Sequence, residues 1–172
     1  MINYKNLICE TPDFPISGVL FRDVSPVLEN PQALQQVIAD MGQLINLDEI
    51  DSFVGVESRG FIFASMLAAK FNKGFIPLRK AGKLPPPVVQ KSYSLEYGQA
   101  TLEMIPSKNA RGHQVVIIDD VLATGGTLAA SIELCGKANY KVVDILVLIN
   151  LTFLNQMKFG NELIKSVIQY DS

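Results

Sequence analysis

Two patterns of apolar residues alternate along most of the chain. In one, four or more apolar residues follow one another, and in the other they recur about every three to four positions. The first pattern predicts strands at 52–56, 74–77, 115–118 and 144–150, and the second predicts helices at 31–45, 61–71 and 127–138. Because strands and helices alternate, we expect an α/β fold with a central, mainly parallel sheet flanked by helices.

The alternation stops between residues 79 and 106. Three consecutive prolines at 85–87 exclude a helix there. Within 92–97, tyrosine and leucine alternate with polar residues, as in a strand with one buried face. We therefore expect 79–106 to form a hairpin arm, or flexible hood, within a single domain that spans residues 1–172.

The most specific chemical pattern follows the third predicted strand. Asp119 and Asp120 come after four apolar residues, and a turn of small residues leads into the next helix; this turn consists of Ala123, Thr124, Gly125, Gly126 and Thr127. Backbone N–H groups at a helix N-terminus favour a phosphate. Adjacent carboxylates repel phosphate and suit diol hydroxyls or Mg²⁺ instead. A ribose 5-phosphate satisfies both the turn and the acid pair. The alternative is that the acids only cap the helix, but a cap needs one acid rather than two.

Basic residues follow the first two predicted strands. Glu57, Ser58, Arg59 and Gly60 form the turn after the first, and Arg79, Lys80 and Lys83 follow the second. Ligands of parallel sheets collect at the carboxyl ends of the strands, so these groups could bind a second anion such as pyrophosphate. Two alternatives remain from these residues alone: a surface ion pair between Arg59 and Glu57, and a solvated role for Lys83.

Composition narrows the class of protein. The 172 residues are 48% hydrophobic and 19% charged, with a net charge of −2, so there is no basic field for nucleic acid. The most apolar stretch, 142–154, contains polar residues and is too short to span a bilayer. Cys9 and Cys135 lack metal-ligand spacing. These features predict a soluble cytoplasmic protein that binds neither nucleic acid nor membrane.

Several blocks of the chain together resemble the type I phosphoribosyltransferases. They read PDFPISGVLFRDVSPVL at 12–28, GVESRGFIFA at 55–64, PLRKAGKLPPP at 77–87, SYSLEYG at 92–98 and ATGGT at 123–127. Their order also matches, and ATGGT after two acids is similar to the adenine phosphoribosyltransferase branch. The chain departs from many relatives at Ala64, where they carry glycine.

The resemblance implies a reaction and a role for each motif. Phosphoribosyl pyrophosphate and adenine would give AMP and pyrophosphate through an oxocarbenium-like transition state, with Mg²⁺ held mainly by substrate and water. The acid pair and the 123–127 turn would hold the ribose and its 5-phosphate, and the basic turns would hold pyrophosphate, with Arg59 also acting in catalysis. A homodimer is implied as well, in which Arg79 could reach the neighbouring subunit's site.

The resemblance also implies a base pocket and a proton-transfer group. In the N-terminal segment of about 30 residues, Phe21 would stack on adenine while the main chains of Leu20 and Arg22 read its edge. Related hypoxanthine–guanine enzymes place an acid at the position of Ala123, which cannot transfer a proton. Glu96 on the hood is therefore expected to be the general acid/base, unless it is only the exposed face of a strand.

Two other functions remain open. A phosphoribosyltransferase for another purine would differ in the base that it accepts. A regulator with the same fold would bind phosphoribosyl pyrophosphate without turnover, but it would be expected to carry a nucleic-acid-binding extension or to lack part of the catalytic set.

Overall fold

The computed structural model describes residues 2–94, 98–107 and 112–172. The chain forms two compact units, Met1–Asp40 and Met41–Ser172. In the first unit the elements are the 3-10 helix η1 (Tyr4–Leu7), strands β1 (Cys9–Pro12) and β2 (Leu20–Asp23), helix α1 (Ser25–Glu29) and most of helix α2 (Pro31–Gln43).

An antiparallel hairpin of β1 and β2 is the main feature of the first unit, with Pro12 opposite Leu20. The Asp13 carboxylate closes its turn by accepting a 2.7 Å hydrogen bond from the Gly18 N–H. Phe14 and Phe21 pack edge to face, with ring centroids 5.1 Å apart. This hairpin was not predicted from the sequence.

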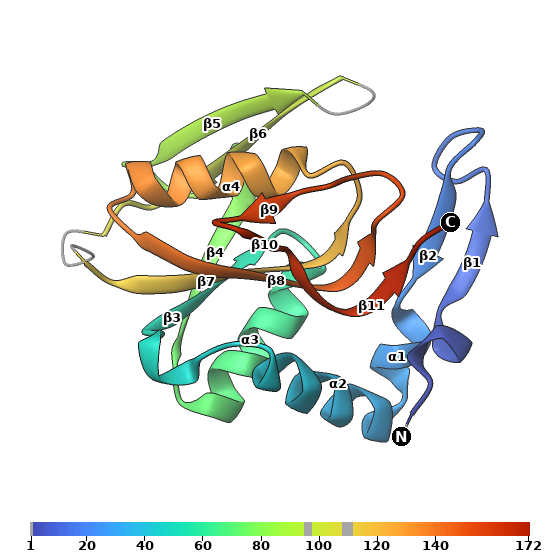
Figure 1. The fold of residues 1–172 in the computed structure, drawn as a ribbon. Helices are drawn as coiled ribbons and strands as arrows, with labels where there is room; N and C mark the ends of the chain where they lie inside the picture. The colour runs from blue at the N-terminus through green and yellow to red at the C-terminus, as the bar shows by residue number, and fades with distance from the viewer. Residues whose placement is uncertain (1, 95–97, 108–111) are drawn as a thin grey trace. The chain divides into compact units, whose positions relative to one another are not determined.

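A seven-stranded sheet organises the second unit, in the order β11-β8-β7-β3-β4-β6-β5. Its strands are β3 (Ser52–Val56), β4 (Gly74–Lys80), β5 (Val89–Ser94), β6 (Gln99–Met104), β7 (Gln114–Leu122), β8 (Lys141–Leu151) and β11 (Lys165–Tyr170). Helix α3 (Gly60–Phe71) covers one face and α4 (Gly126–Lys137) covers the other (Figure 1). The 3-10 helix η2 (Leu47–Glu49) and a small hairpin of β9 (Lys158–Phe159) and β10 (Glu162–Leu163) complete the unit.

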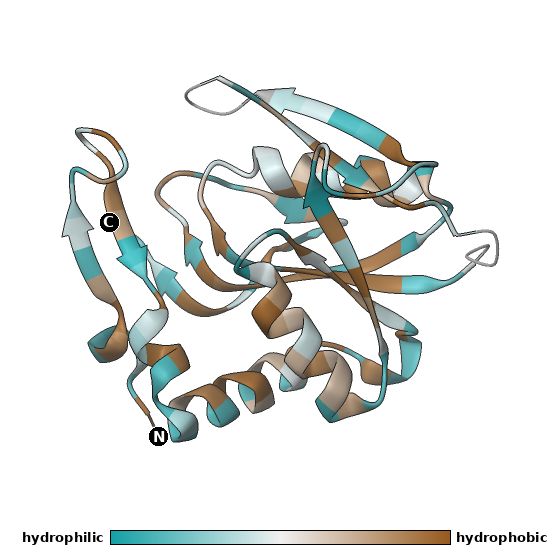
Figure 2. Ribbon diagram, turned by 180° about the vertical axis from the view of Figure 1, so that it is seen from behind, coloured by the Kyte–Doolittle hydropathy of each residue, from teal (hydrophilic) through white to brown (hydrophobic). Residues whose placement is uncertain are grey.

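The inner strands are apolar because helices cover both faces of the sheet. All five residues of β3 are buried, and hydrophobic colour runs through the neighbouring strands in Figure 2. The predicted fold class is thus confirmed. β7 and β8 are longer than expected, so that Asp119 and Asp120 lie inside β7, and the last parallel strand, β11, was missed.

The arm between residues 79 and 106 contains a hairpin, as predicted. β5 and β6 pair along their whole length, from Val89 opposite Met104 to Ser94 opposite Gln99. β6 also pairs with the end of β4, at Arg79 and Lys80. The hairpin therefore extends the central sheet at one edge.

Candidate active site

Three turns meet at the carboxyl edge of the sheet. β3 lies between β4 and β7 in parallel, with Gly55 opposite both Pro77 and Ile118, so the three strands end side by side. A Cβ on Gly60 would lie 2.7 Å from the Ile118 carbonyl oxygen and 3.0 Å from Asp119 Oδ1. Glycine at this position lets the turn after β3 lie directly against the acid pair of β7.

Residues 123–127, the phosphate loop, comprise the connection after β7 and the first two residues of α4. Gly125 is the N-cap of α4 and has φ +89°, a left-handed conformation that favours glycine. It offers no side-chain cap, so the first N–H groups of α4 remain available to an anion. Thr127 Oγ1 lies 3.3 Å from the Tyr93 hydroxyl of β5. This contact joins the loop to the arm.

Asp119 and Asp120 are both buried, at 8% and 7% exposed. Burial and the neighbouring Asp120 carboxylate raise the pKa of Asp119 well above its usual range. Arg59 Nε lies 2.6 Å from Asp120 Oδ2. The alternative that the acids cap a helix is wrong, since they lie inside β7 and Gly125 occupies the N-cap.

Glu57 holds the cations that follow β4. Its carboxylate accepts hydrogen bonds from Arg79 Nη2 at 3.2 Å, Lys83 Nζ at 2.6 Å and the Lys80 N–H at 2.8 Å. Burial alone would raise the pKa of Glu57, but these donors outweigh it and lower the pKa to about 2. Glu57 thus pairs with Arg79 and Lys83, and Arg59 pairs with Asp120, while the Lys83 side chain stays 46% exposed.

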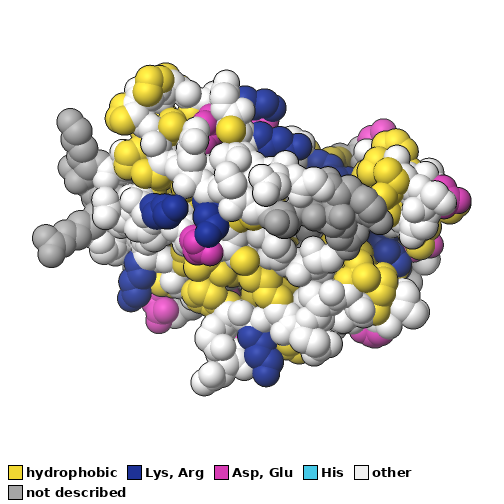
Figure 3. Space-filling model, turned by 90° about the horizontal axis from the view of Figure 1, so that it is seen from above, with side chains coloured by type: hydrophobic (Ala, Val, Ile, Leu, Met, Phe, Trp, Pro, Cys, Tyr) yellow, Lys and Arg dark blue, Asp and Glu magenta, His cyan; other side chains and the backbone are white. Residues whose placement is uncertain are grey.

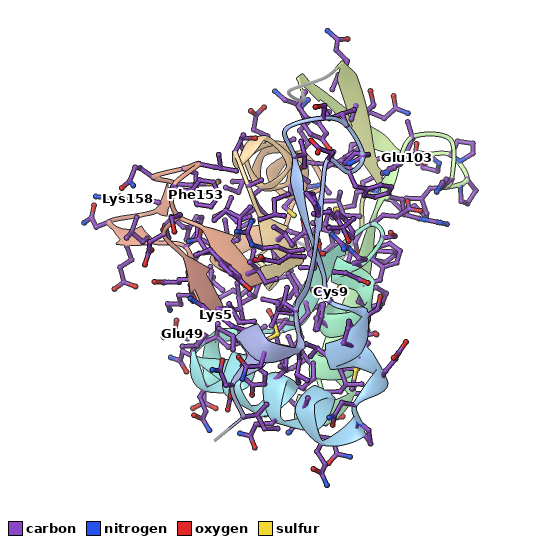
Figure 4. All side chains as sticks on the ribbon, turned by 90° about the vertical axis from the view of Figure 1, so that its right-hand side faces the viewer. Lys5, Cys9, Glu49, Glu103, Phe153 and Lys158 are labelled. Atoms are coloured by element: carbon purple, nitrogen blue, oxygen red, sulfur yellow. The ribbon has the colours of Figure 1, made fainter. Side chains whose placement is uncertain are left out.

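Glu103 is a site residue that the sequence analysis missed. It lies on β6, where Figure 4 labels it, and is 1% exposed. Its Oε1 accepts hydrogen bonds from the Lys83 N–H at 2.8 Å and the Leu84 N–H at 2.7 Å. Burial favours the neutral acid, yet these N–H donors and the Gln90 amide lower the pKa of Glu103. The available signal was a charged residue directly between the apolar Leu102 and Met104.

Glu96, the proposed base-pocket residues and Ser58 complete the set of predicted site residues. Glu96 lies outside the described residues. Leu20, Phe21 and Arg22 lie on β2 of the first unit, where Arg22 is buried and Leu20 is exposed. Ser58 is exposed beside Arg59. Their roles in substrate binding stay predictions.

Basic side chains lie beside acidic ones on the face in Figure 3, without a continuous basic field. Among the residues that the structure describes, no group of three or more His, Cys, Asp or Glu side chains could hold a metal ion. None of the described helices is long and apolar enough to cross a membrane.

Comparison with known proteins identifies the family. The family profile of the phosphoribosyl transferase domain matches residues 23–158. An adenine phosphoribosyltransferase from Bdellovibrio bacteriovorus is 50% identical over 169 residues, which cover 98% of this chain and 100% of that protein. The chain belongs to the adenine phosphoribosyltransferase family.

Solved structures of the adenine phosphoribosyltransferase family have the same fold. The enzyme from Thermoanaerobacter pseudethanolicus matches with a TM-score of 0.91 and 39% identity, covering 97% of this chain and 98% of its own. The Giardia lamblia enzyme complexed with 9-deazaadenine matches with a TM-score of 0.90 and 38% identity, covering 98% and 97%. The type I phosphoribosyltransferase fold expected from the sequence is confirmed.

Proposed function

We propose that this protein transfers the 5-phosphoribosyl group from phosphoribosyl pyrophosphate to adenine, releasing AMP and pyrophosphate in purine salvage. The observation that carries the proposal is the meeting of three turns at one sheet edge, with an acid pair between a phosphate loop and a cluster of cations. Membership of the adenine phosphoribosyltransferase family, and the 9-deazaadenine complex of the Giardia lamblia relative, support the choice of base.

Each part of the donor has a proposed partner. The phosphate loop binds the 5-phosphate through the N–H groups at the start of α4. Asp119 and Asp120 hold the ribose diol, because an ionised carboxylate accepts hydrogen bonds through both of its oxygens. The departing pyrophosphate binds to the turn 57–60, which includes Arg59, and to Arg79, Lys80 and Lys83. These cations stabilise its charge. Bond breaking at the anomeric carbon leads bond making, so the sugar passes through an oxocarbenium-like state.

The cations of the proposed pyrophosphate site are already paired with carboxylates. Arg59 contacts Asp120, while Arg79 and Lys83 contact Glu57. An entering pyrophosphate group competes with these acids, and a diol that hydrogen-bonds to Asp120 competes with Arg59. Donor binding therefore has to exchange internal ion pairs for ligand contacts.

Mg²⁺ is proposed as the cofactor, held mainly by pyrophosphate oxygens and water. Mg²⁺ commonly uses one or two carboxylates together with substrate phosphates, and β7 offers two adjacent carboxylates. When bound, the ion neutralises charge on the leaving group. Asp119 and Asp120 are the residues of this chain that would contact it or its waters.

Adenine is proposed to bind at the N-terminal hairpin. Phe21 would stack on the ring, and the main-chain groups of Leu20 and Arg22 would distinguish its 6-amino group from a 6-oxo group. Glu96 would manage the proton of the ring nitrogen. Replacing Glu96 by Gln should lower kcat by on the order of a hundredfold or more and alter its pH profile. Full turnover of this variant across pH would assign the proton to another group or to water.

The protein is further proposed to be a cytoplasmic homodimer. Phe75 of β4 and Ile105 after β6 are 38% and 43% exposed, and both line an apolar cavity of about 310 Å³. Among the described residues, β4 pairs with β6 at Arg79 and Lys80 alone, so a second copy could cover the rest of this edge and its apolar side chains. Light scattering of the purified protein tests this: a monomer at assay concentration would rule it out.

Both described cysteines are free thiols, as in a reducing compartment such as the cytoplasm.

The deciding experiment measures pyrophosphate release from phosphoribosyl pyrophosphate with adenine, hypoxanthine, guanine or xanthine, each with and without Mg²⁺. Turnover restricted to adenine and lost with EDTA is expected. Turnover on an oxopurine would show that the base assignment is wrong. Donor binding without turnover on any base would favour a regulator.

A further inference from the structure

The turn after β8 supports the phosphate loop from behind. It comprises residues 152–157, between the end of β8 at Leu151 and the start of β9 at Lys158. Figure 4 labels Phe153 and Lys158, which mark this stretch of chain. Nothing in its sequence, TFLNQM, resembles a motif for phosphate or sugar binding. Its contacts, however, lead directly to the loop.

Asn155 makes the connection. Its Nδ2 donates to the Ala123 carbonyl oxygen at 2.8 Å, to the Leu151 carbonyl oxygen at 3.0 Å and to Asn150 Oδ1 at 3.1 Å. Its Oδ1 accepts from the Met157 N–H at 3.1 Å. Three acceptors around one atom and a donor at the other leave a single orientation for the amide. Asn155 therefore joins the end of β8, its own turn and the first residue of the phosphate loop.

The bond to Ala123 sets the direction of a peptide group in the loop. The peptide between Ala123 and Thr124 is not among the cis bonds of the structure, so its C=O and N–H point in opposite directions. Since Asn155 holds the carbonyl oxygen of Ala123 on its own side, the N–H of Thr124 is directed away from Asn155. Without this bond the peptide could rotate, and its N–H would lose a fixed direction.

Met157 supports the loop at a second point. A Cβ on Gly125 would lie 2.9 Å from Met157 Sδ, so the thioether fills the space on that side of the glycine. Gly125 already needs its left-handed φ of +89° to begin α4. The bond from the Met157 N–H to Asn155 Oδ1 fixes the backbone that carries this thioether.

We propose that Asn155 is a positioning residue for the 5-phosphate of the substrate: it orients the Ala123–Thr124 peptide and, through Met157, supports Gly125. The inference rests on the proposed function, which assigns the 5-phosphate to this loop. Asn155 is not expected to touch the substrate. It acts by limiting the conformations of the loop before the phosphate arrives, which lowers the cost of ordering on binding.

Two ligands that each represent half of the donor test the proposal. Ribose 5-phosphate reports on the phosphate loop, and pyrophosphate with Mg²⁺ reports on the turns after β3 and β4. The main variant is Asn155→Ser, whose hydroxyl can still accept from the Met157 N–H but is too short to reach Ala123. Asn155→Ala removes both functions. The control is Thr152→Val in the same turn, because the Thr152 hydroxyl bonds the Tyr170 carbonyl and Asp171 and does not contact the loop.

Calorimetry should show ribose 5-phosphate binding weakened about fivefold in Asn155→Ser, because the hydrogen bond that orients the phosphate loop is lost together with those to Leu151 and Asn150. Pyrophosphate binding should be unchanged. In turnover, KM for phosphoribosyl pyrophosphate should rise by a similar factor while KM for adenine and kcat stay the same. Thr152→Val should match the unsubstituted protein in both assays.

Unchanged ribose 5-phosphate binding in both Asn155 variants, or equal weakening of both ligands, would overturn the assignment. If Asn155→Ala does not fold, Asn155→Ser still decides, because it keeps the local turn. Failure of the unsubstituted protein to bind ribose 5-phosphate at all is a different result, and it would refute the proposed function itself.

Discussion

Glu57 should make a measurable, pH-dependent contribution to stability. It is the only carboxylate among the described side chains that accepts hydrogen bonds from both Arg79 and Lys83, and its side chain is 7% exposed. The change Glu57→Gln keeps the shape of the side chain and removes its charge. The unfolded chain ionises this group near the ordinary value of 4.5, whereas the folded protein lowers its pKa to about 2.

The size of the effect follows from these two values. One pKa unit corresponds to about 1.4 kcal/mol, so the difference sets an upper limit of about 3 kcal/mol. Arg79 and Lys83 are 32% and 46% exposed, and water screens both pairs. We therefore expect Glu57→Gln to lower the free energy of unfolding by about 1–2 kcal/mol near neutral pH.

The sign of the pH dependence is set by the lowered pKa. A carboxylate of this kind stabilises the fold above its unfolded pKa, and the contribution is lost as the pH falls through the folded pKa. The gap between the two proteins should thus be widest above pH 4.5 and close toward about pH 2. Urea unfolding of the ligand-free proteins at a series of pH values measures it.

A matched control separates this effect from general charge loss. Glu133 forms an ion pair with Lys91 on the surface and is 54% exposed, so Glu133→Gln should have a smaller effect. If the Glu57→Gln gap stayed constant from neutral pH into this acid range, the charge of Glu57 would not be the source of the stability, and the reasoning would be refuted.

Three further predictions concern the proposed site. Burial and Asp120 raise the pKa of Asp119, so kcat/KM for phosphoribosyl pyrophosphate should fall on acidification at a higher pH than an ordinary aspartate titrates. Asp119→Asn should lower activity and remove this acidic limb of the pH profile. Gly125→Ala should weaken ribose 5-phosphate binding about tenfold or more, because it strains a φ of +89° and places Cβ 2.9 Å from Met157 Sδ. Unchanged binding in calorimetry would contradict this prediction. Glu103→Gln removes the charge that binds the Lys83 and Leu84 N–H groups. It should weaken pyrophosphate binding a few-fold and leave ribose 5-phosphate binding intact, as isothermal titration of both ligands can check.

Local features of this protein could be predicted from its sequence. Strand β3 has the predicted bounds, and α3 and α4 begin within a residue of the predicted positions, because apolar periodicity and glycine turns act over a few neighbouring residues. The turns at 57–60 and 123–127 were also recognised, since each lies between a buried strand and a helix. The edge at which they meet follows from parallel pairing.

The pairing partners of the site residues were decided by the tertiary structure. Sequence proximity left open an ion pair between Arg59 and Glu57. In the structure Arg59 reaches Asp120 on β7, while Glu57 binds cations 22 and 26 residues away. Asn155 contacts Ala123 across 32 residues and carries no motif. Such contacts depend on strand register and on the path of each loop, which bring these distant groups to within 2.6–3.2 Å of one another. Local periodicity carries no information on those distances. The sequence therefore determined the helices, strands and turns, whereas tertiary packing determined which charged groups and amides contact one another.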